Sequence, residues 1–158
     1  IHILSKAFFD KLMAKLAIND SNVENQNDCF ISILGTVSFD WNNTELIPYF
    51  KEDHPNTITL YFDDTLQDYE LNGNKYLAMN ECQAKFLFEF IKNNATKQNC
   101  FIHCLAGISR SGAVGEFICD YTQSSYEEFK QLNPQIHPSS HIKNMLNKLW
   151  RDDARISI

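Results

Sequence analysis

The stretch HCLAGISRS, residues 103–111, decides most of what the sequence predicts. It places Cys104 and Arg110 in one short segment with five residues between them. The apolar residues 100–102 before it predict a buried strand, and residues 111–121 after it predict a helix. A loop from the carboxyl end of a strand to the start of a helix binds anions well, because its N–H groups converge and the helix dipole favours negative charge. We therefore expect an anion site at this loop.

The same residues predict a reactive thiol. An environment that holds an oxyanion also lowers the pKa of a cysteine, and the thiolate is the nucleophilic form. The planar guanidinium of Arg110 matches two oxygens of a phosphate group, and Gly107 gives the loop its freedom in φ. The alternative interpretation is a buried structural cysteine in an ordinary turn between a strand and a helix.

Strands and helices alternate along the rest of the chain. We expect strands at 1–4, 29–34 and 57–62, helices at 6–18, 81–93, 125–132 and 140–150, and a polar loop at 63–75. This alternation predicts an α/β fold with a central, mostly parallel sheet that has helices on both faces. Neither a repeat nor a linker interrupts the sequence, so we expect a single domain over residues 1–158.

Composition restricts the partners. The net charge of −6 argues against a protein that grips nucleic acid through a basic face, although one arginine and a ring of amides can still hold a single phosphate. The sequence contains no apolar run long enough to span a membrane and no signal-peptide pattern. We therefore expect neither a nucleic-acid nor a membrane partner.

The chain has five cysteines, whose spacings match no disulfide framework or zinc motif. Cys29, Cys100 and Cys119 lie in apolar stretches and are expected in the core. This usage fits a reducing, cytoplasmic setting, and we expect no metal and no cofactor.

The run HCxAGxSRS resembles the signature loop of the cysteine-dependent protein phosphatases, most closely their dual-specificity branch. The resemblance implies a phosphotyrosine-protein-phosphatase-like fold. It also implies metal-independent hydrolysis of phosphotyrosine, and of phosphoserine and phosphothreonine, through a cysteinyl-phosphate intermediate. The expected partner is a phosphorylated protein, and we expect the enzyme to be a monomer.

The resemblance also implies roles for individual residues. Cys104 would be the nucleophile, Arg110 would stabilise the transition state, and Ser111 would help the sulfur to leave. His103 would orient the loop and help to keep the pKa of the thiol low. The residues that would bind the substrate phosphate are Leu105, Ala106, Gly107, Ile108, Ser109 and Arg110.

The reaction also needs a general acid to protonate the leaving group. The family supplies an aspartate from a loop after an earlier strand, and the phase of residues 60–62 selects Asp64, with Asp63 and Asp68 as alternatives. The distance along the chain from Asp64 to Cys104 is longer than usual in the family. The extra residues fall in a polar insert at 69–76, and Glu70 would be the next candidate.

Two further segments are open to interpretation. Residues 133–139 resemble the family segment that packs beside the signature loop. Trp41, Tyr49 and Phe50 could wall a pocket for an aromatic ring or could be plain core. The spacers of the signature loop contain no lysine, which favours a phosphoprotein over a multiply phosphorylated lipid.

Two other functions remain open. One is a catalytically weak phosphate-binding module of the same fold. The other is a cysteine transferase such as a rhodanese or an arsenate reductase. Rhodanese loops do not require an arginine–serine pair, and the related arsenate reductases carry their Cys-x5-Arg loop near the amino terminus.

Overall fold

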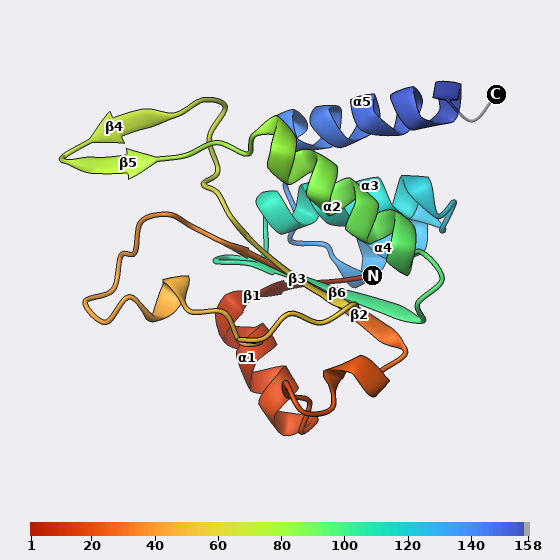
Figure 1. The fold of residues 1–158 in the computed structure, drawn as a ribbon, viewed down its shortest axis with the longest axis horizontal. Helices are drawn as coiled ribbons and strands as arrows, with labels where there is room; N and C mark the ends of the chain where they lie inside the picture. Colours follow the sequence, from red (N-terminus) through yellow and green to blue (C-terminus); the bar gives the residue numbers. More distant parts are fainter. Residues whose placement is uncertain (157–158) are drawn as a thin grey trace.

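Four parallel strands form the central sheet, in the order β1-β6-β2-β3 (Figure 1). The computed structural model describes residues 1–156, so the last two residues of the expected domain lie outside the described residues. The strands of this sheet are β1 (His2–Ser5), β2 (Asp28–Leu34), β3 (Thr57–Tyr61) and β6 (Asn99–Cys104). The α-helices are α1 (Lys6–Lys15), α2 (Glu81–Asn94), α3 (Arg110–Tyr121), α4 (Tyr126–Leu132) and α5 (Ser140–Ile156).

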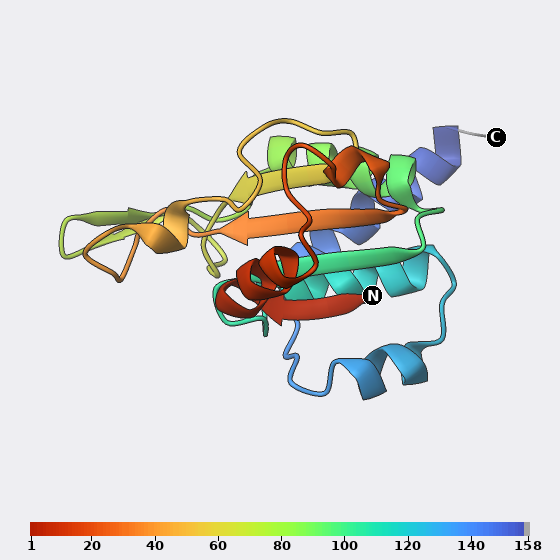
Figure 2. The ribbon, with the colours of Figure 1, turned by 90° about the horizontal axis from the view of Figure 1, so that it is seen from below.

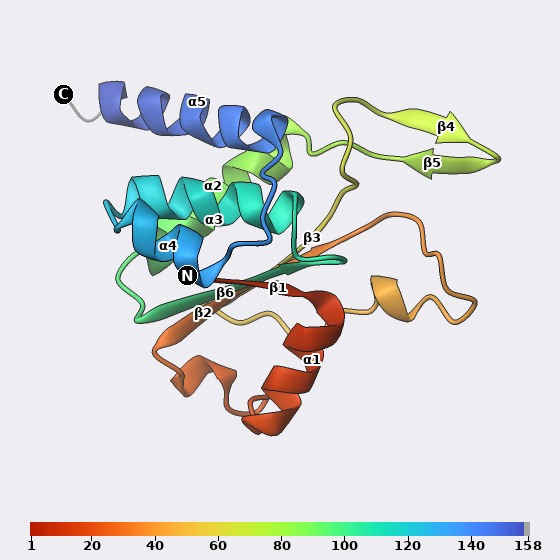
Figure 3. The ribbon, with the colours of Figure 1, turned by 180° about the vertical axis from the view of Figure 1, so that it is seen from behind.

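Helices cover both faces of the sheet. α1 lies on one face, while α2, α3 and α5 lie on the other (Figures 1 and 3). β2 sits in the middle of the sheet, and six of its seven residues are buried, which explains why its sequence is continuously apolar rather than alternating. The predicted α/β fold with a central parallel sheet is therefore confirmed.

The two faces have separate apolar cores. On the α1 face, Phe9 and Met13 pack with Phe30 of β2 and with Phe50. On the other face, Phe88 of α2 and Phe117 of α3 pack against the sheet. Tyr49 and Phe50 belong to the α1 core, the second of the two interpretations that the sequence leaves open, whereas Trp41 is fully exposed.

Polar side chains cap the starts of two helices. Asn80 and Gln83 form a reciprocal capping box at α2, and Ser125 accepts from the N–H of Glu128 at α4. Two short 3₁₀ helices, η1 (Val23–Asn25) and η2 (Thr44–Leu46), lie in the connections on either side of β2.

The segment predicted as a polar loop at 63–75 instead contains an antiparallel hairpin of β4 (Tyr69–Leu71) and β5 (Asn74–Tyr76). The rings of Tyr69 and Tyr76 stack with centroids 4.8 Å apart, and Gly73 adopts a positive φ at the turn. Because the hairpin is short and exposed, its alternation is too weak to stand out in the sequence.

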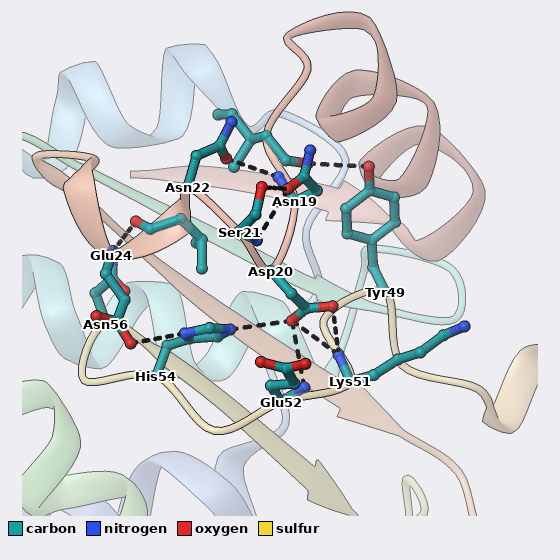
Figure 4. Close-up of polar contacts among 12 residues, drawn as sticks. Asn19, Asp20, Ser21, Asn22, Glu24, Tyr49, Lys51, Glu52, His54 and Asn56 are labelled. Carbon is teal, nitrogen blue, oxygen red and sulfur yellow. Dashed lines mark hydrogen bonds and ion pairs between the residues drawn. The ribbon is translucent and has the colours of Figure 1, made fainter.

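A half-buried histidine, His54, joins two connections on the α1 face (Figure 4). His54 lies between two carboxylates, with Nε2 at 3.0 Å from Asp20 and Nδ1 at 2.9 Å from Glu24. The hydrogen bond with Glu24 outweighs burial and raises the pKa of His54. The contact holds the chain before β3 against the loop that follows α1.

Across the described residues 1–156, none of the helices has the length and apolar character that crossing a membrane requires.

Candidate active site

The candidate site lies at the edge of the sheet where the parallel strands have their carboxyl ends. The heads of the strand arrows in Figure 2 mark this edge. Cys104 is the last residue of β6 and pairs in register with Ser5 at the end of β1. The loop of residues 105–109 then leads into α3, whose first residue is Arg110. The predicted order of strand, loop and helix is therefore confirmed.

Gly107 lets the loop press against the end of β1. It has a φ of +72°, and a Cβ atom at this position would lie 2.5 Å from the carbonyl carbon of Leu4. The carbonyl oxygen of Leu105 accepts from the N–H of Lys6 at 3.2 Å. Both the positive φ and the close approach require glycine here, as the sequence predicts.

Residues 135–139 hold the loop from its other side. The N–H of His137 donates to the carbonyl of Ile108 at 3.2 Å, and the N–H of Ser139 donates to that of Ser109 at 3.3 Å. The side-chain amide of Gln135 reaches the carbonyl of Gly107 at 3.5 Å. These contacts confirm that the segment packs beside the loop. Gln135 was missed by the sequence reasoning, because its partners are main-chain atoms.

Cys104 is buried, yet its pKa is lowered. Burial opposes the thiolate, but the hydroxyl and N–H of Ser111, the charge of Arg110 and the N–H of Ile108 together outweigh it. The Cys104 Sγ and Ser111 Oγ atoms are 3.1 Å apart. The loop therefore stabilises a negative charge at the sulfur, the property expected of a nucleophilic thiol.

Arg110 is also buried, and it links the loop to the end of β3. Its Nη1 donates to the carbonyl of Phe62 at 2.7 Å. The guanidinium forms no further hydrogen bond within residues 1–156, so its other N–H groups are available to a ligand. Phe62 directly precedes the acidic residues from which a general acid would come, and the contact is therefore a direct connection between the two loops.

His103 lies below the loop and is neutral. Burial, assisted by the positive charge of Lys6, lowers its pKa to about 3. Its Nε2 is 2.9 Å from Ser32 Oγ, and its ring packs on that of Phe9 with centroids 4.4 Å apart. A neutral His103 ring can hold Cys104 in place, but it adds no positive charge beside the thiol.

The acidic candidates differ in what their side chains do. Asp63 accepts from the N–H of Thr36 at 3.0 Å, from the Thr36 hydroxyl and from the N–H of Leu77 at 2.8 Å. Asp68 accepts from the N–H of Ala78 at 2.9 Å. Both carboxylates therefore anchor main chain. Asp64 is exposed and forms no hydrogen bond within residues 1–156.

The hairpin is a closed excursion of the main chain that begins next to Asp64. The N–H of Asp63 donates to the carbonyl of Leu77 at 2.6 Å. The main chain is therefore joined at both ends of residues 64–76, and this segment forms a closed loop. The long interval between Asp64 and Cys104 is explained by this closed excursion. Glu70 lies on β4 opposite Lys75, in the part of the hairpin that projects away from the sheet (Figure 1).

No family model and no curated protein matches the chain. Among solved structures, the chain is similar to one described as the crystal structure of PTPMT1 in complex with PI(5)P. The similarity covers 99% of this chain and 92% of that chain, with 13% sequence identity and a TM-score of 0.49. A likeness at this level does not assign an activity to the chain.

Proposed function

We propose that the chain is a cysteine-dependent phosphatase that hydrolyses phosphate monoesters on proteins. The observation that carries the proposal is the geometry of the loop, which places the buried Cys104 Sγ 3.1 Å from the Ser111 hydroxyl and at the start of the helix that Arg110 begins, where these groups and the N–H of Ile108 lower the pKa of the thiol. An environment that stabilises a thiolate against burial is costly for a purely structural cysteine, but a nucleophile needs it. The resemblance of residues 103–111 to the phosphatase signature loop supports the same function.

The first step forms a bond between the Cys104 sulfur and phosphorus and breaks the bond from phosphorus to the leaving oxygen. Arg110 and the N–H groups of residues 105–110 would stabilise the equatorial oxygens of the transferring group. Asp64 would give its proton to the leaving oxygen, because among the three aspartate candidates its carboxyl group alone forms no hydrogen bond within residues 1–156.

In the second step, water attacks the phosphorus of the cysteinyl phosphate and releases inorganic phosphate and the thiolate. Asp64, now ionised, would accept the proton of that water. The hydroxyl of Ser111, 3.1 Å from the sulfur, would stabilise the departing thiolate. His103 would hold the end of β6 in place through Ser32. None of these steps calls on a metal ion or a cofactor, and we propose that the enzyme acts as a monomer in a reducing, cytoplasmic setting.

A kinetic panel tests this function. The chain and its Cys104→Ser variant would be assayed with phosphotyrosine, phosphoserine and phosphothreonine peptides and with an aryl phosphate, in the presence and absence of EDTA. We expect turnover that depends on Cys104 and is unchanged by EDTA. The second candidate, a phosphate-binding module, would bind phosphate without any turnover that the serine variant removes.

A further inference from the structure

A groove borders the signature loop on the side of α1. It has a volume of about 310 Å³ and is lined by Lys6, Ala7, Asp10, Asp40, Thr44, Glu45 and Leu105. Leu105 directly follows the nucleophile, so the groove begins beside the catalytic position. Leu105 and Glu45 also line a smaller cavity of about 30 Å³ that Arg110 reaches. The two spaces are therefore neighbours that share one wall.

The groove is acidic. Lys6 is its one cationic residue, and its Nζ already pairs with Asp10 at 2.6 Å. Asp40 and Glu45 form no ion pair with any lysine, arginine or histidine within residues 1–156. These two carboxylates consequently leave an uncompensated negative charge next to the site that binds the phosphate.

Local contacts fix the two carboxylates in place. Glu45 Oε2 accepts from the N–H of Phe39 at 2.8 Å, and Asp40 accepts from the N–H of Thr44 at 3.0 Å and from the Thr44 hydroxyl. The hydroxyl bond outweighs desolvation and lowers the pKa of Asp40, which keeps it ionised. The loop of residues 39–45 therefore holds its negative charges in fixed positions. A cationic ligand can bind there with little loss of conformational entropy in the loop.

We propose that this groove binds a lysine or arginine side chain close to the phosphorylated residue of the substrate, so that the enzyme selects phosphoproteins with basic flanking sequence. The inference rests on the proposed function. The expected ligand is a cationic peptide, because an acidic groove attracts positive charge and repels acidic peptides, polyphosphorylated lipids and nucleic acids. The phosphate itself is held by the buried Arg110 and the amides of the loop, so attraction and phosphate binding use different groups.

The test uses phosphopeptides that are identical except for one position. An arginine, an alanine or a glutamate is moved through the three residues on each side of the phosphorylated residue, and kcat/KM is measured for each peptide. At the best position we expect kcat/KM to be five- to tenfold higher for arginine than for glutamate, since exposed ion pairs contribute roughly two- to fivefold each. The ratio should fall as salt is added.

Two conservative variants locate the effect. Asp40→Asn and Glu45→Gln keep acceptor oxygens for the loop but remove the charges, and the double variant should bring the arginine-to-glutamate ratio to within about twofold of unity. Glu127→Gln is the matched control, because Glu127 is an exposed acid on α4 beyond the β1 edge of the sheet (Figure 2). Its ratio should equal that of the unchanged protein.

The result that would overturn the inference is a ratio near one at every position, or a preference for glutamate, with aryl phosphate turnover intact. If no phosphate ester is hydrolysed, the proposed function has failed instead. The binding of a cationic side chain in the groove is then tested by fluorescence anisotropy with the Cys104→Ser variant. Tighter binding of the arginine phosphopeptide than of the glutamate phosphopeptide would support it. Equal dissociation constants for the two peptides would reject it.

Discussion

Cys100 and Cys104 lie on the same strand and are both buried, yet their thiols have opposite character. A hydrogen bond with Cys29, together with burial, raises the pKa of Cys100 well above its usual value. Cys104 is just as buried, but the Ser111 hydroxyl, two amides and the charge of Arg110 lower its pKa. Burial alone therefore does not set the charge of a thiol in this protein. The groups at the end of the strand decide it.

The largest expected effect separates the two cysteines by substitution. Cys104→Ser should reduce kcat by at least about 10⁴-fold, because the alcohol is a far weaker nucleophile at neutral pH. Phosphate binding should persist, since Arg110 and the amides remain. Cys100→Ala is the matched control and should keep kcat within about twofold, with a modest loss of stability. If both variants lost kcat equally, Cys104 would not differ from Cys100 in its role.

Arg110→Lys tests the charge that acts on Cys104 but not on Cys100. Lysine keeps one positive charge and loses the planar pair of donors, so we expect kcat/KM to fall by at least about a hundredfold. Steady-state kinetics with one aryl phosphate measures the change, and Arg151→Lys on the exposed face of α5 should be neutral. A near-normal rate would mean that Arg110 does not contact the phosphoryl group.

Asp64→Asn sharpens the assignment of the acid. Hydrolysis of poorly activated alkyl phosphates should slow by about a hundredfold, while activated aryl phosphates should slow by less than about tenfold, because a good leaving group needs little protonation. Asp63→Asn should instead lower the melting temperature, since Asp63 holds Thr36 and Leu77. If Asp63→Asn or Asp68→Asn shows the dependence on leaving group, Asp64 is not the acid.

The smallest effect comes from Ser111→Ala, which should move Cys104 toward the behaviour of Cys100. A lowered pKa means that the thiolate forms at lower pH, so activity rises as the pH rises through that pKa. Removing the Ser111 hydroxyl raises the pKa of Cys104 and moves this rise to higher pH, with about a tenfold loss of kcat/KM on the acidic side. An unchanged pH profile would show that the hydroxyl does not stabilise the thiolate.

The sequence predicts the loop and the fold well, because both depend on strong local patterns. The apolar run at 29–34 predicts a buried strand and Gly107 predicts an unusual φ in the loop, and the structure agrees with both. The support of the loop by residues 135–139 could be anticipated only through the resemblance of that segment to known phosphatases.

Other features could not be predicted, since they depend on which segments meet in space. The bond from Arg110 to the carbonyl of Phe62 uses a main-chain atom, which any residue supplies. The roles of Asp63 and Asp68 as anchors depend on the return of the hairpin to Leu77. The full exposure of Trp41 likewise depends on the path of the loop that carries it, which the sequence does not show.

Alkylation of the folded chain by iodoacetamide at a series of pH values, with each cysteine quantified by mass spectrometry, tests the central claim most directly. We predict that Cys104 reacts at pH values well below 9 and that phosphate protects it, while Cys100 stays unmodified until the protein unfolds. The exposed Cys82 serves as the comparison thiol in the same sample. If Cys104 reacts only at the pH at which Cys82 does, or no faster than Cys100, the loop does not stabilise a thiolate and the account is wrong.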